Sequence, residues 1–319
     1  MEQSLRHAVY AQLSQPDPSW DGLLTEMTDT KQKVLVRLME RGTDLVVGST
    51  ADRLHDLTEE MGLRQQARSL IESDDRADRL AGLSLFIEFG WKADPEWLVE
   101  ETSSDQAEIE AVVHVLANAS SPLTRVIGIN LAIERGILSV YGTHGLFRLL
   151  REDPDLLLER LNRDGVQDPE LLVPLLRILT HSKRASEQAP VAAVIANLEH
   201  ESPLVRGAAC GVLGKYGWRG VVRDQVDLIV DELFDDESAY VRIKVYEMLG
   251  RWGDAAARAK LAFAAESETN SRALFTIARN LGERDSQSFG PRGDHTLARR
   301  FSTWAEVSAL DTIHQPLPP

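Results

Sequence analysis

The sequence predicts an all-α protein in which about six helical hairpins stack into a right-handed α-α superhelix. Two observations predict this class. Apolar residues recur at helical spacing along most of the 319 residues, without the alternation that is typical of strands. In addition, one helical pattern occurs several times, and a repeated helix pair can bury its apolar face only against its neighbours.

Residues 202–217 show the repeated pattern most clearly. Ser202 suits a helix N-cap, Pro203 suits the first helical position, and Gly217 suits the left-handed residue after the last turn. Between these ends, apolar or aromatic residues follow the i, i+3, i+4, i+7, i+8, i+11 series of a helix with one apolar face. These are Val205, Ala208, Ala209, Val212, Leu213 and Tyr216.

The same frame fits other parts of the chain. It ends at Gly90, Gly136, Gly217, Gly253 and Gly282, which are separated by 46, 81, 36 and 29 residues. Its predicted starts are Asp75, Ser121, Ser202, Ser238 and Ser267. The longest gap holds a degenerate copy that begins at Asp168, carries Lys183 in place of the glycine, and contains Pro174, which should kink the helix. Amphipathic segments such as 190–201 and 221–234 supply the second helix of each pair, and small residues predict close helix crossings at Gly82, Gly128 and Ala209.

These patterns divide the chain into three parts. Residues 1–50 are expected to form an N-terminal helical cap, which a stack of repeats needs to cover its first apolar face. Residues 51–282 form the repeat array. Residues 283–319 are expected to be a linker, one amphipathic helix over 296–310 and a loose end.

Composition limits the function. Fifty acidic and 35 basic residues give a formal net charge of −15, which argues against nucleic acid as a partner, although a local basic strip remains compatible with it. Cys210 is the only cysteine, so an internal disulfide and a thiolate zinc site are excluded. The sequence contains no long apolar run and no signal-peptide pattern, so we expect a cytoplasmic protein without direct membrane insertion.

Two stretches carry a resemblance to a known family. "ESPLVRGAACGVLGKYG" (201–217) and "DESAYVRIKVYEMLGRWG" (236–253) resemble the HEAT repeat, and the similarity extends over about residues 50–282. It implies an armadillo-type α-solenoid that serves as a scaffold or adaptor, whereas a minority of such proteins are lyases or DNA glycosylases. The short spacing near the C-terminal end is similar to phycobilisome-lyase-like HEAT proteins. Residues 53–90 with the following repeats are similar to bacterial HEAT proteins linked to envelope polysaccharide synthesis, which makes a membrane-associated machine a candidate partner.

Arginines recur at one repeat position. These are Arg79, Arg125, Arg206 and Arg242. A row of guanidinium groups could bind carboxylates or phosphates. We favour the alternative that each arginine forms a structural stack with nearby acids, as the HEAT resemblance implies. The acids next to them in sequence are Asp74, Asp75, Glu201, Asp236 and Glu237.

Aromatic residues gather at the repeat ends. Trp91 and Trp218 directly follow a closing glycine, and Trp252 and Tyr216 directly precede one. Because tryptophan and tyrosine are enriched where partners bind, these four are candidate partner-binding residues. The alternative is that the rings complete the core between neighbouring repeats.

Catalytic signals are weak. Cys210 lies among apolar positions and should be inert, His144 lies in a predicted glycine-flanked turn, and no histidine pair has the spacing of a helical metal site. We therefore expect no metal, no cofactor and no enzymatic activity. The prediction is a scaffold or adaptor that binds a protein partner. The alternatives are a DNA-binding protein similar to a DNA glycosylase, with a basic concave groove, and a bilin-lyase-like protein.

Overall fold

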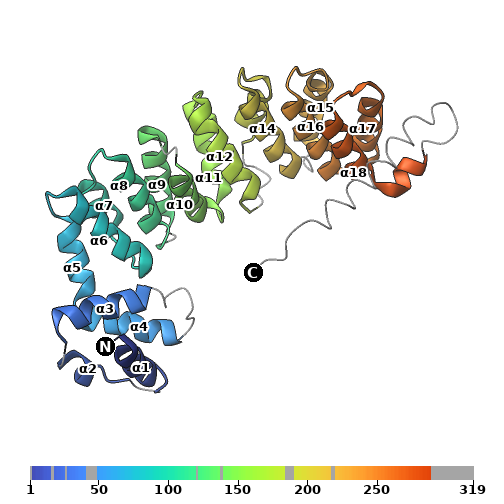
Figure 1. Cartoon of the computed structure of the whole chain (residues 1–319). Coiled ribbons are helices and arrows are strands. Elements are labelled where there is room, and N and C mark those ends of the chain that lie inside the picture. Colours follow the sequence, from blue (N-terminus) through green and yellow to red (C-terminus); the bar gives the residue numbers. More distant parts are fainter. Residues whose placement is uncertain are drawn as a thin grey trace. The chain divides into compact units, whose positions relative to one another are not determined.

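The computed structural model describes residues 2–15, 18–25, 27–40, 49–119, 121–136, 139–183, 190–216 and 220–288. Within these ranges every regular element is a helix, and no strand occurs, as predicted. Figure 1 shows the helices labelled in chain order. The chain forms two compact units, residues 1–149 and 150–319. This division differs from the predicted boundaries at residues 50 and 282.

Unit 1 contains ten helices among its described residues. They are α1 (Glu2–Leu13), α2 (Asp21–Thr25), α3 (Asp29–Glu40), α4 (Ser49–Glu60), α5 (Leu63–Ile71), α6 (Arg76–Glu88), α7 (Pro95–Glu100), α8 (Gln106–Leu116), α9 (Pro122–Arg135) and α10 (Val140–Leu150). α1 packs on α3 and α4, and α4 leads into α5. α6 packs between α5 and α8, while α7 and α9 pack on α8 and on each other.

The second unit contains eight α-helices and one 3₁₀ helix among its described residues. They are α11 (Pro154–Asp164), α12 (Pro169–His181), α13 (Ala192–Ala196), η2 (Asn197–Glu199), α14 (Pro203–Tyr216), α15 (Gly220–Leu233), α16 (Ala239–Trp252), α17 (Ala255–Ser267) and α18 (Ser271–Ser288). α12, α14, α16 and α18 pack side by side in chain order (Figure 1). α11, α13, α15 and α17 pack on this row and form the second layer.

Most of the predicted helix ends are confirmed. The Ser121 hydroxyl accepts from Thr124 N, and Ser121 N donates to the Thr124 hydroxyl, which completes a capping box around the start of α9. Asp75 and Asp168 cap α6 and α12 with their carboxylates, which accept from Ala77 N and Glu170 N. At the other ends, Gly90, Gly136 and Gly253 have φ values of 63°, 73° and 64°, which favour glycine.

The predicted helix start and end are wrong for the C-terminal copy of the repeat pattern. Ser267 ends α17, and the cap of α18 is Asn270, whose side chain accepts from Arg272 N and Ala273 N. Gly282 lies inside α18, which continues to Ser288, so the predicted linker starts with helix. The predicted helix over 296–310 and the loose end lie outside the described residues.

The close helix crossings follow the small residues. A Cβ atom on Gly82 would lie 2.6 Å from the Ala67 carbonyl oxygen, so α5 and α6 touch through their backbones. A Cβ on Gly128 would lie 2.3 Å from a methyl group of Leu149, and Ala209 is fully buried. The crossings at Gly82 and Gly128 fit only glycine, and the crossing at Ala209 holds a methyl group.

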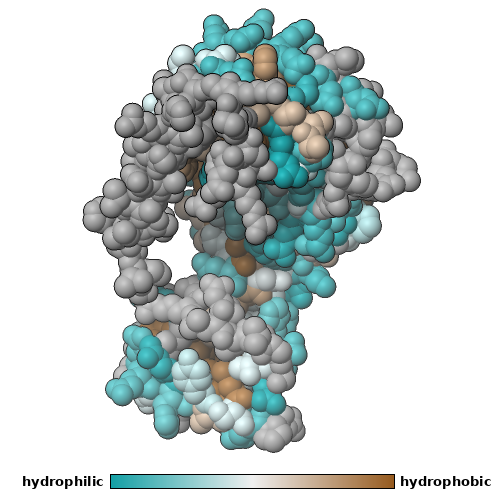
Figure 2. Space-filling view, turned by 90° about the vertical axis from the view of Figure 1, so that its right-hand side faces the viewer, coloured by the Kyte–Doolittle hydropathy of each residue, from teal (hydrophilic) through white to brown (hydrophobic). Residues whose placement is uncertain are grey.

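Exposed apolar residues are scattered. Large apolar side chains with more than a third of their surface exposed include Tyr10, Leu123, Val126, Val140, Tyr141, Leu204 and Phe263. On the face drawn in Figure 2, the coloured surface is mainly hydrophilic, with hydrophobic atoms in small separate areas. Across the described helices, none combines the length and apolar character needed to cross a bilayer.

Candidate functional site

Three of the four recurrent arginines clamp neighbouring helices of a row. Arg206 on α14 donates from Nε and Nη2 to both oxygens of Asp236, which precedes α16, at 2.8 and 2.9 Å. Arg242 on α16 holds Glu268, which precedes α18, at 2.9 and 3.1 Å. In unit 1, Arg79 makes the same bidentate contact; it lies on α6, and its partner Glu108 lies in the first turn of α8, at 3.1 and 2.9 Å. A planar guanidinium group is the cation best suited to a bidentate carboxylate contact.

The remaining nitrogen of each arginine ties down the loop before its own helix. Nη1 of Arg206 donates to the carbonyl oxygens of His200 and Glu201, six and five residues earlier. Arg79 and Arg242 bond the carbonyls at the same two offsets. Asp236 takes part twice, because its side chain accepts from Arg206 and its carbonyl oxygen accepts from Arg242. The sequence Arg206, Asp236, Arg242, Glu268 is therefore one continuous set of bonds.

This arrangement corrects the predicted arginine partners. The acids next to each arginine in sequence contribute backbone carbonyls, whereas the carboxylates come from 26 to 30 residues downstream. Arg125 is not at the equivalent place, since it lies on α9, which packs on α7 and α8 outside the row formed by α6 and α8. The three arginines in the clamps are thus occupied by bonds to the protein itself.

Two of the clamp carboxyls, Glu108 and Glu268, have a lowered pKa. Burial opposes the charge on Glu268, but hydrogen bonds from Arg242, Asn270 N and Tyr246 outweigh it and lower the pKa of this carboxyl. The pKa of Glu108 is lowered as well, because the bonds from Arg79 and Ser103 overcome its burial. Both carboxylates have less than a tenth of their surface exposed, so they stabilise the helix rows without being available to a ligand.

The candidate partner-binding aromatic residues mostly belong to the core. Trp91 is 2 % exposed and stacks on Phe89 with ring centroids 4.9 Å apart. Tyr216 has no exposed surface. Trp252 is half-buried, and its indole nitrogen donates to Leu213 O at 3.0 Å. The predicted partner contact at Trp91 and Tyr216 therefore does not fit the structure, because the rings fill space between helices; Trp218 lies outside the described residues.

The other singled-out groups have structural surroundings. Cys210 is fully buried, and burial followed by the nearby Asp236 charge raises the pKa of its thiol to about 12. His144 lies within α10 rather than in a turn. The glycine beside it, Gly145, is needed because a Cβ there would lie 2.6 Å from the ring of His114. Within the described ranges, no three His, Cys, Asp or Glu side chains gather so as to hold a metal ion.

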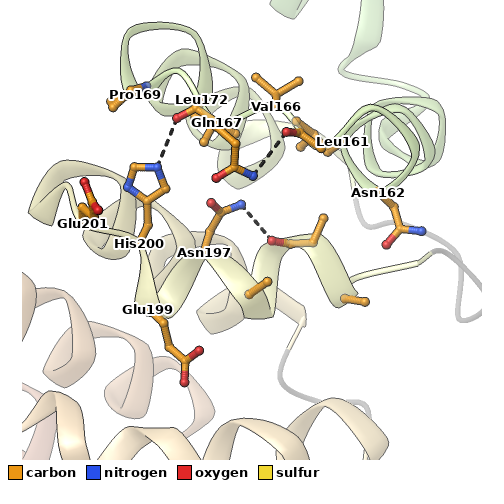
Figure 3. A pocket seen from close by; sticks show the side chains of 14 residues that line it. Leu161, Asn162, Val166, Gln167, Pro169, Leu172, Asn197, Glu199, His200 and Glu201 are labelled. Carbon is orange, nitrogen blue, oxygen red and sulfur yellow. Dashed lines mark hydrogen bonds between the residues drawn. The ribbon is translucent and has the colours of Figure 1, made fainter.

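One cavity of about 850 Å³ lies in the second unit between α11, the start of α12 and the α13–η2 segment. α13 has only five residues, so it does not cover α11 along its length. Figure 3 shows that several polar side chains around this cavity bond to the protein itself. His200 Nδ1 accepts from Ser202 N and its Nε2 therefore donates to Gln167 O at 3.1 Å, while Asn197 Nδ2 donates to Ala193 O. These bonds leave few polar groups to recognise a ligand.

A surface groove crosses the row α12, α14, α16 and α18. It consists of two adjoining hollows of about 360 and 480 Å³, which share Tyr240, Lys244 and Glu247. Its charged and titratable lining residues are Arg177, His181, Lys244, Glu247, Arg251, Arg272 and Arg279. Its apolar and aromatic lining includes Tyr240, Ile243, Met248 and Phe275. We call this surface the α12–α18 groove.

The charge of the groove is opposite to that of the chain. Five Lys or Arg residues line it against the single carboxylate of Glu247, whereas acids outnumber bases by 50 to 35 in the whole sequence. Glu247 lies between Lys244 at 2.8 Å and Arg279 at 3.7 Å. Arg177 and Arg272 form no ion pair with any described residue, and both are exposed. The groove therefore carries a net positive charge.

The floor of the groove depends on two glycines of α14. The ring of Tyr240 lies against Gly207, where a Cβ atom would come within 2.3 Å of it. A Cβ on Gly211 would meet Thr180 of α12 at 3.3 Å. Lys244 Nζ lies 5.8 Å from the centroid of the Tyr240 ring, within the range of a cation–π contact. The two glycines thus allow Tyr240 and Thr180 to pack closely on α14, with the Lys244 ammonium beside the Tyr240 ring.

One repeat position carries a partial sequence signal for this groove. Two residues before the closing position of the repeat frame, the second half of the chain has His181, Lys215, Arg251 and Asn280, whereas the first half has Glu88 and Glu134. Of these residues, His181 and Arg251 line the groove, while Lys215 bonds backbone carbonyls near the end of α12. The loss of the acids at this position therefore agrees with a more basic surface in the second unit.

Comparison with protein-family models, with curated proteins and with solved structures gave no significant match.

Proposed function

We propose that the chain is a HEAT-type α-solenoid that acts as a non-catalytic scaffold and holds a protein partner along the α12–α18 groove. Within each unit, helices pack in two layers, and the arginine clamps recur at one register, as expected for stacked repeats. Two candidates for a chemical role were considered from the sequence, the Cys210 thiol and the clamp arginines. The thiol is buried, and the arginines are engaged in structural bonds. The single reduced cysteine also supports a cytoplasmic location.

The groove is the observation that carries this proposal. It crosses four helices, and two of its exposed arginines, Arg177 and Arg272, form no ion pair within the described chain. Arginine and tyrosine are the residues that most often contribute binding energy in protein interfaces. Arg177, Arg272 and Tyr240 provide them here on rigid helices. The predicted alternative of nucleic acid shares the positive charge, but the net charge of −15 opposes a long polyanion.

The test is affinity capture from an extract of the source cells with three forms of the protein. The groove variant is Arg177→Glu with Arg272→Glu. The control variant, Arg37→Glu with Arg135→Glu, makes the same charge change at exposed positions outside the groove. We expect specific proteins to be retained by the unmodified chain and the control, and lost with the groove variant. Retention that is equal in all three forms, or no specific protein in any of them, would refute the proposal.

A further inference from the structure

We propose that the α12–α18 groove binds an extended acidic peptide segment that carries one large apolar side chain. This inference rests on the proposed scaffold function and specifies its partner. The segment can belong to another protein chain or to a loop of a folded partner, since the groove recognises its charge and its anchor. Three features of the groove support this choice.

Charge complementarity is the first feature. The guanidinium groups of Arg177 and Arg272 make no ion pair with a described residue, and Arg251 uses only Nη1, in a bond to Gly211 O at 3.1 Å. Each of these guanidinium groups can bind a carboxylate through two parallel hydrogen bonds. Glu247 already neutralises its neighbours Lys244 and Arg279 in part. The positive charge available to a ligand is therefore concentrated on Arg177, Arg251 and Arg272.

An apolar slot is the second feature. The hollow of about 480 Å³ between α16 and α18 is bordered by Ile243, Phe275 and the ring of Tyr240. A cavity of a few hundred Å³ is large enough for a leucine or aromatic side chain. An apolar peptide side chain can fill this slot. A nucleic-acid base could also stack on Tyr240 or Phe275, so the preference for a peptide comes from the formal net charge of −15, which opposes a long polyanion.

The length of the row is the third feature. Packed helices lie about 8–10 Å apart, so four neighbouring helices span about 27 Å. An extended chain advances about 3.3 Å per residue, and about eight residues would cross the row. The two hollows adjoin at Tyr240, Lys244 and Glu247, so one extended chain can contact both. Glycine at 207 lets the Tyr240 ring lie close against α14, which limits the height of the ring between the two hollows.

The test measures binding of fluorescein-labelled peptides of about ten residues by fluorescence anisotropy. Glu and Asp alternate with Ser in each peptide, and the central residue is Leu, Phe, Trp or Ala. Two further probes are the Trp peptide with Gln and Asn in place of the acids, and an oligothymidine of equal length. The protein forms are the unmodified chain, Arg177→Glu with Arg272→Glu, and Arg37→Glu with Arg135→Glu, each verified as folded by circular dichroism.

We expect at least one acidic peptide with an apolar centre to bind, and its affinity to fall about tenfold or more with Ala at the centre, since burying such a side chain is worth about 1.5–3 kcal/mol. The groove variant should lose at least tenfold in affinity, while the control stays within about twofold. Loss of the acids from the peptide should abolish binding, and added salt should weaken it.

Other results would overturn the inference. Equal binding by the groove and control variants would place the peptide elsewhere. Tighter binding of oligothymidine than of every peptide would make the groove a nucleic-acid surface. If no peptide binds but capture from extract still depends on Arg177 and Arg272, the scaffold function stands and the peptide class is wrong. If both experiments fail, the scaffold function fails as well.

Discussion

Replacement of Glu268 by glutamine tests whether the arginine clamps hold the helix row together. In the structure, one carboxylate oxygen accepts from Arg242, Thr269 N and Asn270 N, and the other accepts from Arg242 and Tyr246. Glutamine keeps the size of the side chain but has no charge and turns one of the two acceptors into a donor. Whichever oxygen is replaced, at least two donors lose their acceptor.

The expected loss is about 2–3 kcal/mol in the free energy of unfolding. Removal of one partner of a buried ion pair costs about 3–5 kcal/mol. The Arg242 side chain is 17 % exposed and can recover part of its hydration, so the lower end of that range or slightly less applies. With a urea dependence of about 1–3 kcal/mol per M, the midpoint should fall by about 1 M. The measurement is urea unfolding followed by circular dichroism.

The pH dependence supplies an independent check. The pKa of Glu268 in the folded chain lies below its ordinary value of 4.5. The stabilisation by the ionised carboxylate is therefore complete above pH 4.5 and is lost as the pH falls through the folded pKa. The difference between the unmodified chain and Glu268→Gln should accordingly be constant near neutral pH and shrink below pH 4.5.

The control for this experiment is Glu266→Gln, which removes a charge from an exposed residue in the last turn of α17, two positions before Glu268. An exposed substitution of this kind changes stability by about 0.5 kcal/mol or less. If Glu268→Gln and Glu266→Gln lose the same small amount, or if the deficit persists unchanged well below pH 4.5, the clamp does not stabilise the row.

Three further predictions concern the core. Gly82→Ala should lower the free energy of unfolding by about 1–3 kcal/mol in urea titrations, because its Cβ meets backbone atoms of α5, whereas Gly22→Ala, with open space around it, should be neutral or stabilising. Cys210 should resist a thiol reagent at pH 8 in the native protein and react fully in urea, and a rapid native reaction would contradict its burial. Burial lowers the pKa of His114 below 6.5 despite its bond to Tyr141 O, so unfolding takes up a proton below that pH; stability should decline as the pH falls through 6.5, and His114→Gln should flatten this decline.

The helix starts could be predicted from the sequence because the residues that specify them are close together in the chain. Ser121 with Pro122, and Asp168 with Pro169, specify helix starts through bonds within one turn, and the structure contains both. The same residue pattern at helix starts and ends occurs, however, in helices of both layers. The helix that ends at Gly136 therefore looked equivalent to the others, although it packs outside the row formed by α6 and α8.

Contacts between repeats were harder to predict. Glu108 and Glu268 lie 29 and 26 residues after their arginines, and neither is distinguished from other acids in its own segment. The groove depends on how side chains of four helices come together, which no single helix encodes. Its linear trace is limited to His181 and Arg251, which stand at the repeat position that Glu88 and Glu134 occupy in the first half.

The constant offsets of the clamp have a consequence for how such a chain can change in length. Arg206 and Arg242 bond carbonyls six and five residues before them and a carboxylate ahead of the following helix. Excision of residues 206–241 would leave Arg242 next to the carbonyls of His200 and Glu201, with Glu268 still in front of it. The α14–α16 and α16–α18 junctions thus share one bonding pattern, so loss or duplication of one of these units would change the length of the chain and preserve the arginine clamp.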